Sequence, residues 1–189
     1  MAVLVGKPAP DFSATAVYGN NEIKEFKLSA LKGKHVVLFF YPLDFTFVCP
    51  TELAELARLY PEFVTLGAEV CGVSTDSVYV HKAWHDSSPM VRTVEFPLIA
   101  DSTGALSREF GVYLEEEGVA LRGTFLIDPD GVLRAYEVHD NSIGRYIGET
   151  LRKLQAAIRV REGEGEACPA NWQPGQPTLT PGLDLVGKL

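Results

Sequence analysis

Short, uninterrupted apolar runs alternate with helical patterns along this chain, and that order constrains the fold more than any other feature of the sequence. Each run has few polar side chains, as is typical of strands that are buried on both faces of a sheet. The apolar runs are residues 35–41, 69–74 and 96–100, and the helical patterns after them are residues 51–68, 77–86 and 103–110. The alternation predicts an α/β sandwich with a mostly parallel sheet. Pro61 is expected to break or kink the first helix.

Turn residues predict two hairpins at the ends of this pattern. Residues 7–31 are expected to form a short N-terminal hairpin or an irregular cover. Residues 123–138 predict a hairpin with Pro129-Asp130-Gly131 at its turn, which adds an antiparallel strand pair to the sheet. The clearest helix is predicted at residues 142–160, where apolar residues recur at helical spacing on one stripe. These residues are Ile143, Ile147, Leu151, Leu154 and Ile158.

The composition changes after residue 161. Residues 162–166 alternate glutamate with glycine, and residues 167–189 include four prolines and three glycines, so no regular helix is expected there. The 189 residues are enough for one sizeable core. We therefore predict one domain at residues 1–161 and an extended C-terminal tail at residues 162–189. Two states of the tail stay open, namely wrapping around a surface and simple disorder.

Charge and cysteine content argue against several classes of protein. The net charge is −8 and no stretch is strongly basic, which disfavours nucleic-acid binding. No run approaches the ~18 apolar residues of a membrane span, and no basic leader precedes a long apolar run, so we expect a cytoplasmic protein. Three cysteines are too few for a disulfide scaffold, and neither a zinc-like spacing nor a glycine-rich nucleotide loop is present. No metal or bound cofactor is therefore expected.

Cys49 is the strongest candidate for a reactive residue. It lies between the apolar run 35–41 and the helical pattern 51–68, with Pro50 at the first helical turn. The positive end of a helix favours a thiolate there. An ordinary thiol is only ~3% ionised at pH 7, and making it mostly ionised takes ~3–4 kcal/mol. The helix end supplies about 0.3–1 kcal/mol, so a cation and hydroxyl donors are needed as well.

Two residues are candidates for these supporting groups. Thr46 is three residues before Cys49, where its hydroxyl is able to turn toward the sulfur atom or a substrate. The alternative is that Thr46 only stabilises a turn. Arg122 directly precedes the apolar strand 124–127 and is the arginine best placed to reach this end of the sheet. The alternative for Arg122 is a solvated side chain at a strand start.

The other two cysteines and the histidines are expected to have roles other than that of the reactive thiol. Cys168 lies in the proline-rich tail, where mobility suits a thiol that travels to an oxidised partner, although a free surface cysteine is the alternative. Cys71 is interpreted as core packing. His81 and His85 are expected on a solvated helix face. A cysteine–histidine hydrolase would need one of four histidines near Cys49, which the sequence neither shows nor excludes. These histidines are His35, His81, His85 and His139.

Two motifs at opposite ends of the chain resemble one family. The run with Pro42, Thr46 and Cys49 resembles the Pro-x-x-x-Thr-x-x-Cys motif of the peroxiredoxins. The segment around Cys168 resembles the resolving-cysteine segment of the typical two-cysteine class. Residues 180–189 are similar to the tail of the bacterial alkyl hydroperoxide reductase C subgroup. The resemblance covers essentially the whole chain.

The resemblance implies a thioredoxin-like fold and a thiol peroxidase. Cys49 would attack the peroxide O–O bond and become a sulfenic acid. Thr46 and Arg122 would hold the peroxide and stabilise the charge on the leaving oxygen. Pro42 would shield the sulfenic acid, and Glu52 and Arg145 match positions that orient Arg122 and order the pocket. The list of implied catalytic residues is Cys49, Cys168, Thr46, Arg122, Pro42, Glu52 and Arg145.

The resemblance also implies partners. Cys168 of a partner subunit would form a disulfide with Cys49, although the length of the tail leaves an intrachain bond open. A flavoprotein or a thioredoxin-like protein would reduce that disulfide, and the protein would form homodimers and rings of five dimers. A redox-regulated chaperone or peroxide sensor is the alternative function. The chain lacks the Gly-Gly-Leu-Gly insert of oxidation-sensitive members, so disulfide formation is expected to outrun overoxidation.

Overall fold

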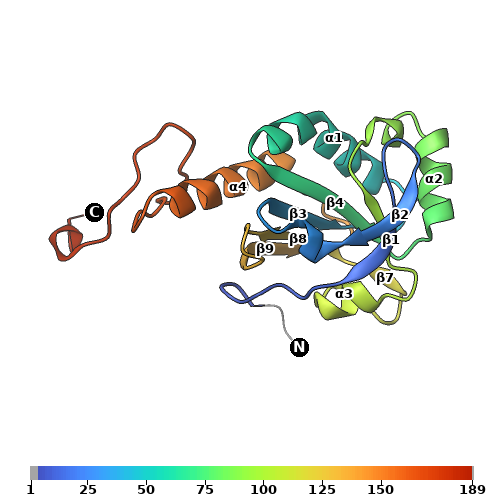
Figure 1. The fold of residues 1–189 in the computed structure, drawn as a ribbon, viewed down its shortest axis with the longest axis horizontal. Coiled ribbons are helices and arrows are strands. Elements are labelled where there is room, and N and C mark those ends of the chain that lie inside the picture. Colours follow the sequence, from blue (N-terminus) through green and yellow to red (C-terminus); the bar gives the residue numbers. More distant parts are fainter. Residues whose placement is uncertain (1–3, 189) are drawn as a thin grey trace. The chain divides into compact units, whose positions relative to one another are not determined.

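The computed structural model describes residues 4–188 of the chain. Contacts divide it into two compact units, of which the first ends at Ile147 and the second begins at Gly148. The first unit contains the sheet and three of the four α-helices (Figure 1).

A seven-stranded sheet forms the centre of the first unit, in the order β2-β1-β5-β4-β3-β8-β9. Its strands are β1 (Ser13–Val17), β2 (Ile23–Lys27), β3 (His35–Phe40), β4 (Ala68–Ser74), β5 (Leu98–Ala100), β8 (Arg122–Ile127) and β9 (Leu133–His139). The N-terminal hairpin, β1 with β2, and the hairpin of β8 with β9 are both confirmed.

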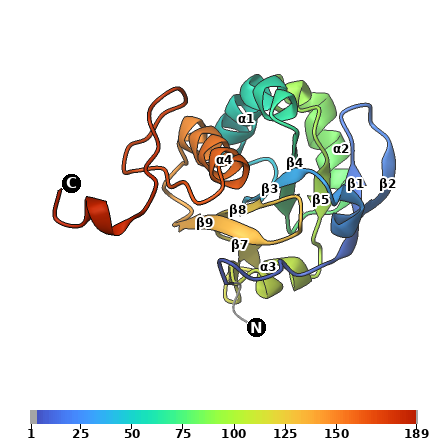
Figure 2. The ribbon, with the colours of Figure 1, turned by 60° about the vertical axis from the view of Figure 1, so that its left-hand side comes forward.

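The expectation of a mostly parallel sheet is wrong. Only β3 with β4 and β4 with β5 pair in parallel, because α1 (Cys49–Thr65) and α2 (Val78–Ser87) supply the crossovers that parallel pairing requires. The other four pairings are antiparallel, since the two hairpins extend this parallel centre on both sides. The α1 and α2 helices cover one face of the sheet, and the short α3 (Ala105–Glu109) lies on the other (Figure 1 and Figure 2).

The central strand β3 is buried along its whole length, because neighbours pair on both edges and other elements cover both faces. The aromatic rings of Phe40, Phe110 and Phe125 pack together with centroids 5.0–5.6 Å apart. Each buried aromatic or aliphatic side chain contributes roughly 1.5–3 kcal/mol by leaving water. This packing fixes the end of β3, from which the chain leads through residues 41–48 into α1.

Several predicted element boundaries are wrong. Pro61 lies inside α1, so the expected break is absent, and a kink at this position stays a prediction. Its missing N–H leaves only the Ala57 carbonyl, four residues earlier, without its helical donor. A small hairpin of β6 (Tyr113–Leu114) and β7 (Val119–Ala120) was not anticipated. The last helix, α4 (Ile147–Glu162), begins five residues later than predicted, so Ile143 lies outside it and is 57% exposed.

The second unit consists of α4 from Gly148 onward and of the chain that follows this helix. Ala167 and Leu179 pair through two main-chain hydrogen bonds of 2.8 and 2.9 Å. The Trp172 indole N–H donates to the Gln176 carbonyl at 3.0 Å. Beyond α4, the described part of this unit has only a 3₁₀ turn at Leu183–Leu185, in keeping with its prolines. The predicted domain boundary at residues 161 and 162 lies inside this unit and stays a prediction.

Residues 4–188 include neither a membrane-spanning helix nor a metal-binding cluster. None of their helices is long and apolar enough to cross a bilayer. Within the same range, no cluster of three or more His, Cys, Asp or Glu residues is arranged to hold a metal ion.

Candidate active site

Cys49 is the first residue of α1, directly after the loop that leaves β3. Its side chain is buried, with 1% of its surface exposed. Pro50 follows in the first helical turn, where its missing N–H leaves no helical hydrogen bond unmade. The positive end of the helix dipole therefore favours a negative charge on the sulfur atom.

Arg122 is brought to Cys49 by the pairing of β8 with β3. These strands are antiparallel, with Phe39 opposite Thr124. Arg122, two residues before Thr124, therefore lies beside the end of β3. Its Nη1 atom lies 3.5 Å from the Cys49 Sγ atom and donates to Glu52 Oε2 at 2.7 Å.

Arg122 is held from both sides and is 3% exposed. Opposite Glu52, its Nε and Nη2 atoms donate to the main-chain carbonyl of Asn141 at 3.0 and 2.8 Å. The planar guanidinium is thereby fixed in one orientation. Sequence reasoning missed Asn141, and no signal was available, because every residue has a main-chain carbonyl.

Glu52 lies one turn after Cys49 and is 3% exposed. Its Oε1 atom accepts from the main-chain N–H of Arg145 at 2.8 Å and from Nε at 2.9 Å. Its Oε2 atom accepts from Arg145 Nη2 at 2.9 Å and from Arg122 Nη1. Burial raises the pKa of Glu52, but the hydrogen bonds from Arg145 and the nearby charges outweigh it, so the pKa lies below its usual value.

Arg145 lies in the turn that precedes α4, and its guanidinium is completely buried. Its Nη1 atom donates to the Gly123 carbonyl at 2.9 Å and to the Thr124 hydroxyl at 3.1 Å. The guanidinium carbon also lies 3.3 Å from the centroid of the Phe39 ring. Burial lowers the pKa of Arg145, and its bonds to Glu52 act in the opposite direction. These contacts explain the late start of α4.

The charges of this cluster do not balance without the thiol. Two guanidinium groups and one carboxylate sum to one positive charge, and all three are buried. A buried uncompensated charge is costly, so the site favours one further anion. Cys49, in contact with Arg122, becomes that anion when its thiol is deprotonated.

A cavity of about 360 Å³ lies beside Cys49 and Arg122. Pro42 and Thr46 line it, and the Thr46 hydroxyl donates to the main-chain carbonyl of Leu43 at 2.8 Å. Outside the loop at residues 42–48, three residues that sequence reasoning missed also line the cavity, namely Glu117, Val119 and Asn141. The first two belong to the unanticipated small hairpin and its turn, which explains why they were missed.

The first unit thus brings together six of the seven predicted site residues, which are Cys49, Thr46, Arg122, Pro42, Glu52 and Arg145. Cys168 lies in the second unit. There its side chain is half-buried, and its Sγ atom lies 3.9 Å from the Ala156 carbonyl.

Cys71 and the histidines lie away from this chemistry. Cys71 is fully buried in β4, and burial raises the pKa of its thiol well above the usual value. None of the four histidines lines the Cys49 cavity or hydrogen-bonds to Cys49 within the described chain, which argues against a cysteine–histidine hydrolase. The expectation that His81 and His85 are solvated is wrong, because they are 0% and 8% exposed.

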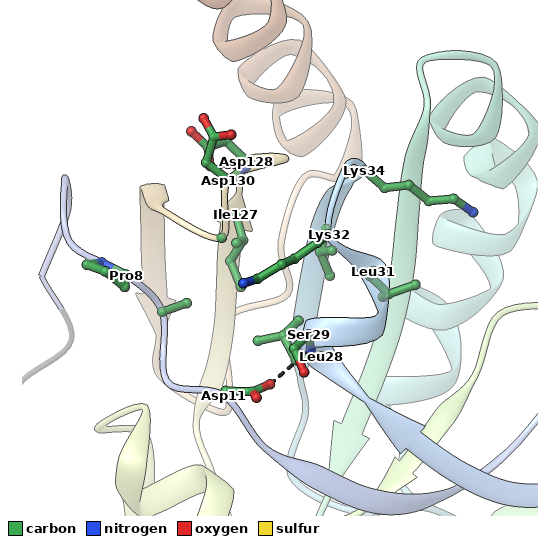
Figure 3. Close-up of a pocket in the computed structure, with 13 residues that line it drawn as sticks. Pro8, Asp11, Leu28, Ser29, Leu31, Lys32, Lys34, Ile127, Asp128 and Asp130 are labelled. Carbon is green, nitrogen blue, oxygen red and sulfur yellow. Dashed lines mark hydrogen bonds between the residues drawn. The ribbon is translucent and has the colours of Figure 1, made fainter.

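A second cavity, of about 330 Å³, is lined by the N-terminal segment, by Leu28, Leu31 and Lys32, and by the end of β8 (Figure 3). The Ser29 N–H donates to Asp11 at its edge at 2.9 Å, and Lys32 extends toward Ile127. Neither a cysteine nor any predicted site residue lines this cavity.

Comparisons with known proteins agree with the geometry. Residues 5–136 match the AhpC/TSA family, and residues 157–185 match the C-terminal domain of 1-Cys peroxiredoxin. The chain is 48% identical to alkyl hydroperoxide reductase C of Pseudomonas aeruginosa, covering 98% of this chain and 99% of the relative. It is 49% identical to peroxiredoxin-2 of Macaca fascicularis, covering 95% and 91%.

Solved structures extend the agreement to the fold. The reduced 2-Cys peroxiredoxin of Plasmodium vivax superposes with a TM-score of 0.87 at 38% identity, covering 92% of this chain and 91% of the other. The thioredoxin-like α/β fold and the resemblance to peroxiredoxins are therefore confirmed. By the extent of the family match and the identity of its relatives, the chain belongs to the AhpC/TSA family.

Proposed function

We propose that this chain is a thiol peroxidase that reduces hydrogen peroxide and organic hydroperoxides, with Cys49 as the nucleophile. The observation that carries the proposal is the 3.5 Å contact between Arg122 Nη1 and Cys49 Sγ, in a cluster that a thiolate would neutralise. The names of the relatives, alkyl hydroperoxide reductase C and peroxiredoxin-2, support the same chemistry.

In the first step, the Cys49 thiolate attacks the terminal oxygen of the peroxide. An S–O bond forms while the O–O bond breaks, and the electron pair leaves on the second oxygen, which takes up a proton to become an alcohol or water. Cys49 is thereby oxidised by two electrons to a sulfenic acid. Four N–H groups of Arg122 donate to described acceptors, which leaves one N–H of Nη2 to bind the peroxide.

Pro42 and Thr46 complete the proposed peroxide site. Thr46 presents its hydroxyl to the peroxide, and Pro42 shields the sulfenic acid from water. Both residues line the cavity beside Cys49 and Arg122, which supports these roles. Glu52 and Arg145 fix the orientation of Arg122 and do not themselves touch the substrate.

In the second step, the thiol of Cys168 attacks the sulfenic sulfur of Cys49, an S–S bond forms and water leaves. We propose that Cys168 comes from the partner subunit of a homodimer, which further assembles into a ring of five dimers. A flavoprotein or a thioredoxin-like dithiol protein then reduces the Cys49–Cys168 disulfide, becomes oxidised itself and restores both thiols. A cytoplasmic location, where such reductants operate, is part of this proposal.

Repeated peroxide consumption tests the proposal. The wild type supplied with a dithiol reductant is expected to consume many equivalents of hydrogen peroxide, whereas Cys49→Ser consumes none. Cys71→Ala is the matched control, because Cys71 lies outside the site, and it is expected to stay active. An active Cys49→Ser variant would refute the assignment, and a wild type that reacts only once would favour a peroxide sensor or redox-regulated chaperone.

A non-reducing gel tests the second step. Peroxide-treated wild type is expected to migrate as a covalent dimer, whereas Cys168→Ser stays monomeric and completes one turnover. A disulfide that leaves the wild type monomeric would show an intrachain bond and refute the intersubunit assignment.

A further inference from the structure

The loop at residues 42–48 holds one residue in an unfavourable conformation. Phe45 has a φ angle of +53°, in the left-handed region that a bulky side chain rarely adopts. It stands directly before Thr46 and directly after Asp44. Such a conformation persists only where the surroundings determine it, and this loop lines the Cys49 cavity.

Asp44 anchors this loop through a buried polar network. Its Oδ1 atom accepts from the Tyr41 hydroxyl at 2.8 Å, and its Oδ2 atom lies 2.7 Å from His81 Nδ1. Its main-chain N–H donates to Asp76 Oδ2 at 2.8 Å, and Asp76 also accepts from the Ser74 hydroxyl. The side chains of Asp44 and His81 are 0% exposed.

His81 connects the loop to the rigid part of the fold. It lies on α2, and its Nε2 atom is 3.2 Å from the Ile99 carbonyl in β5. A carbonyl only accepts, so Nε2 carries a proton, and His81 Nδ1 shares one further proton with Asp44. Burial raises the pKa of Asp44, and the hydrogen bond to His81 acts in the opposite direction.

None of these network residues lines the Cys49 cavity, so they do not touch a bound peroxide. The connection to the reaction runs through the backbone. Thr46 is two residues from Asp44, and its hydroxyl donates to the carbonyl of Leu43, the residue before Asp44. A shift of Asp44 therefore moves both the backbone of Thr46 and the group that orients its hydroxyl.

We infer that Asp44 and His81 are positioning residues for peroxide reduction, which hold Phe45 in its left-handed conformation and thereby set the Thr46 hydroxyl against Cys49. This inference rests on the proposed function. It assigns a role to α2, which contributes no residue to the cavity.

Two rate constants of Cys49 test the inference when they are compared, one for its reaction with hydrogen peroxide and one for its alkylation by iodoacetamide. Alkylation needs the sulfur but not the peroxide site. Asp44→Ala is expected to slow the peroxide reaction by about tenfold or more, since misplacing one orienting group has effects of this size, and to change alkylation by less than about threefold. An unchanged peroxide rate, or an equal fall in both rates, would overturn the inference.

A double-mutant cycle with Thr46→Val separates positioning from general destabilisation. Because Asp44 acts through Thr46, the double variant is expected to be no more than about threefold slower than Thr46→Val alone. Effects that multiply would overturn the inference. Should Asp44→Ala fail to fold, Tyr41→Phe replaces it in the cycle, because it removes only one hydroxyl from the same carboxylate.

Two further variants complete the design. Asp44→Asn is expected to keep its peroxide rate within about threefold of the wild type, because an amide still accepts from Tyr41 and donates to Nδ1. A loss as large as that of Asp44→Ala would overturn the role of the hydrogen bonds.

His85→Ala is the matched control, because this buried histidine lies on the same helix and bonds to Val94 rather than to the loop. It is expected to react with peroxide like the wild type, and a loss equal to that of Asp44→Ala would contradict positioning. A wild type without peroxidase activity would refute the proposed function itself, whereas unchanged variants of an active wild type refute only this inference.

Discussion

Replacing Glu52 with glutamine removes the carboxylate that pairs with both buried arginines, Arg122 and Arg145. The amide keeps the shape of the side chain. Its NH₂ group, however, faces guanidinium N–H donors, which cannot accept a hydrogen bond. Glu52 accepts four hydrogen bonds, three from Arg145 and one from Arg122. The variant therefore takes from both buried guanidinium groups the carboxylate with which they pair.

The expected loss of stability follows from this geometry. Removing one partner of a buried ion pair costs about 3–5 kcal/mol. With a urea m-value of about 2 kcal/mol/M, the midpoint of unfolding is expected to fall by roughly 1.5–2.5 M. Wild type and variant are compared at equal protein concentration, because any oligomer makes the midpoint concentration-dependent.

Glu55→Gln is the matched control for this measurement. Glu55 lies one turn further along α1 and pairs with Arg58 in the same way that Glu52 pairs with its arginines, but at an exposed position. Exposed pairs contribute little to stability, so this variant is expected to unfold at the wild-type midpoint. Equal midpoints for Glu52→Gln and Glu55→Gln would refute the reasoning from the buried cluster.

Four further outcomes are expected. The pKa of Glu52 is lowered in the folded protein, so the stabilisation by its carboxylate is fully present above the unfolded pKa of about 4.3 and is lost as the pH falls through the folded pKa. The difference in unfolding free energy between wild type and Glu52→Gln should therefore shrink below about pH 4. A difference that grows below this pH would contradict the sign of the shift. Arg122→Lys keeps the charge but loses the planar set of donors, so peroxide reduction measured by stopped flow should slow by about 100-fold, and a near-normal rate would show that charge alone suffices. Cys71 should resist alkylation at pH 8 in the native protein and react only after unfolding, as peptide mass spectrometry would detect, because burial raises the pKa of its thiol. At low peroxide doses the same method should find the disulfide rather than Cys49 sulfinate, and dominant sulfinate would defeat that expectation.

Much of the candidate site follows from local sequence. Pro42, Thr46 and Cys49 lie in one short loop between a buried strand and a helix, so their spacing alone places them together. Glu52 follows one helical turn later and necessarily lies near Cys49. Arg122 was predicted from its place before an apolar strand, whereas Arg145 and Glu52 were assigned roles only through the family resemblance.

Other features depend on contacts that no local pattern contains. The helical spacing of residues 142–160 predicts a helix throughout, but the bonds from Arg145 to Glu52 hold the first part of that segment in a turn. His81 has the sequence surroundings of an exposed helix face, yet Asp44 from a distant loop buries and binds it. Long-range hydrogen bonds therefore override local propensity at these positions.

By itself, the sequence determined the strand and helix periods, the place of Cys49 at a helix start and the place of Cys168 in a proline-rich tail, because these features depend on neighbours within a few residues. Only the tertiary structure decided the antiparallel pairing of β8 with β3, the charge balance around Cys49 and the burial of His81. The reason is physical: each of these depends on groups 37 to 93 residues apart in the chain, whose contact exists only after the sheet has assembled.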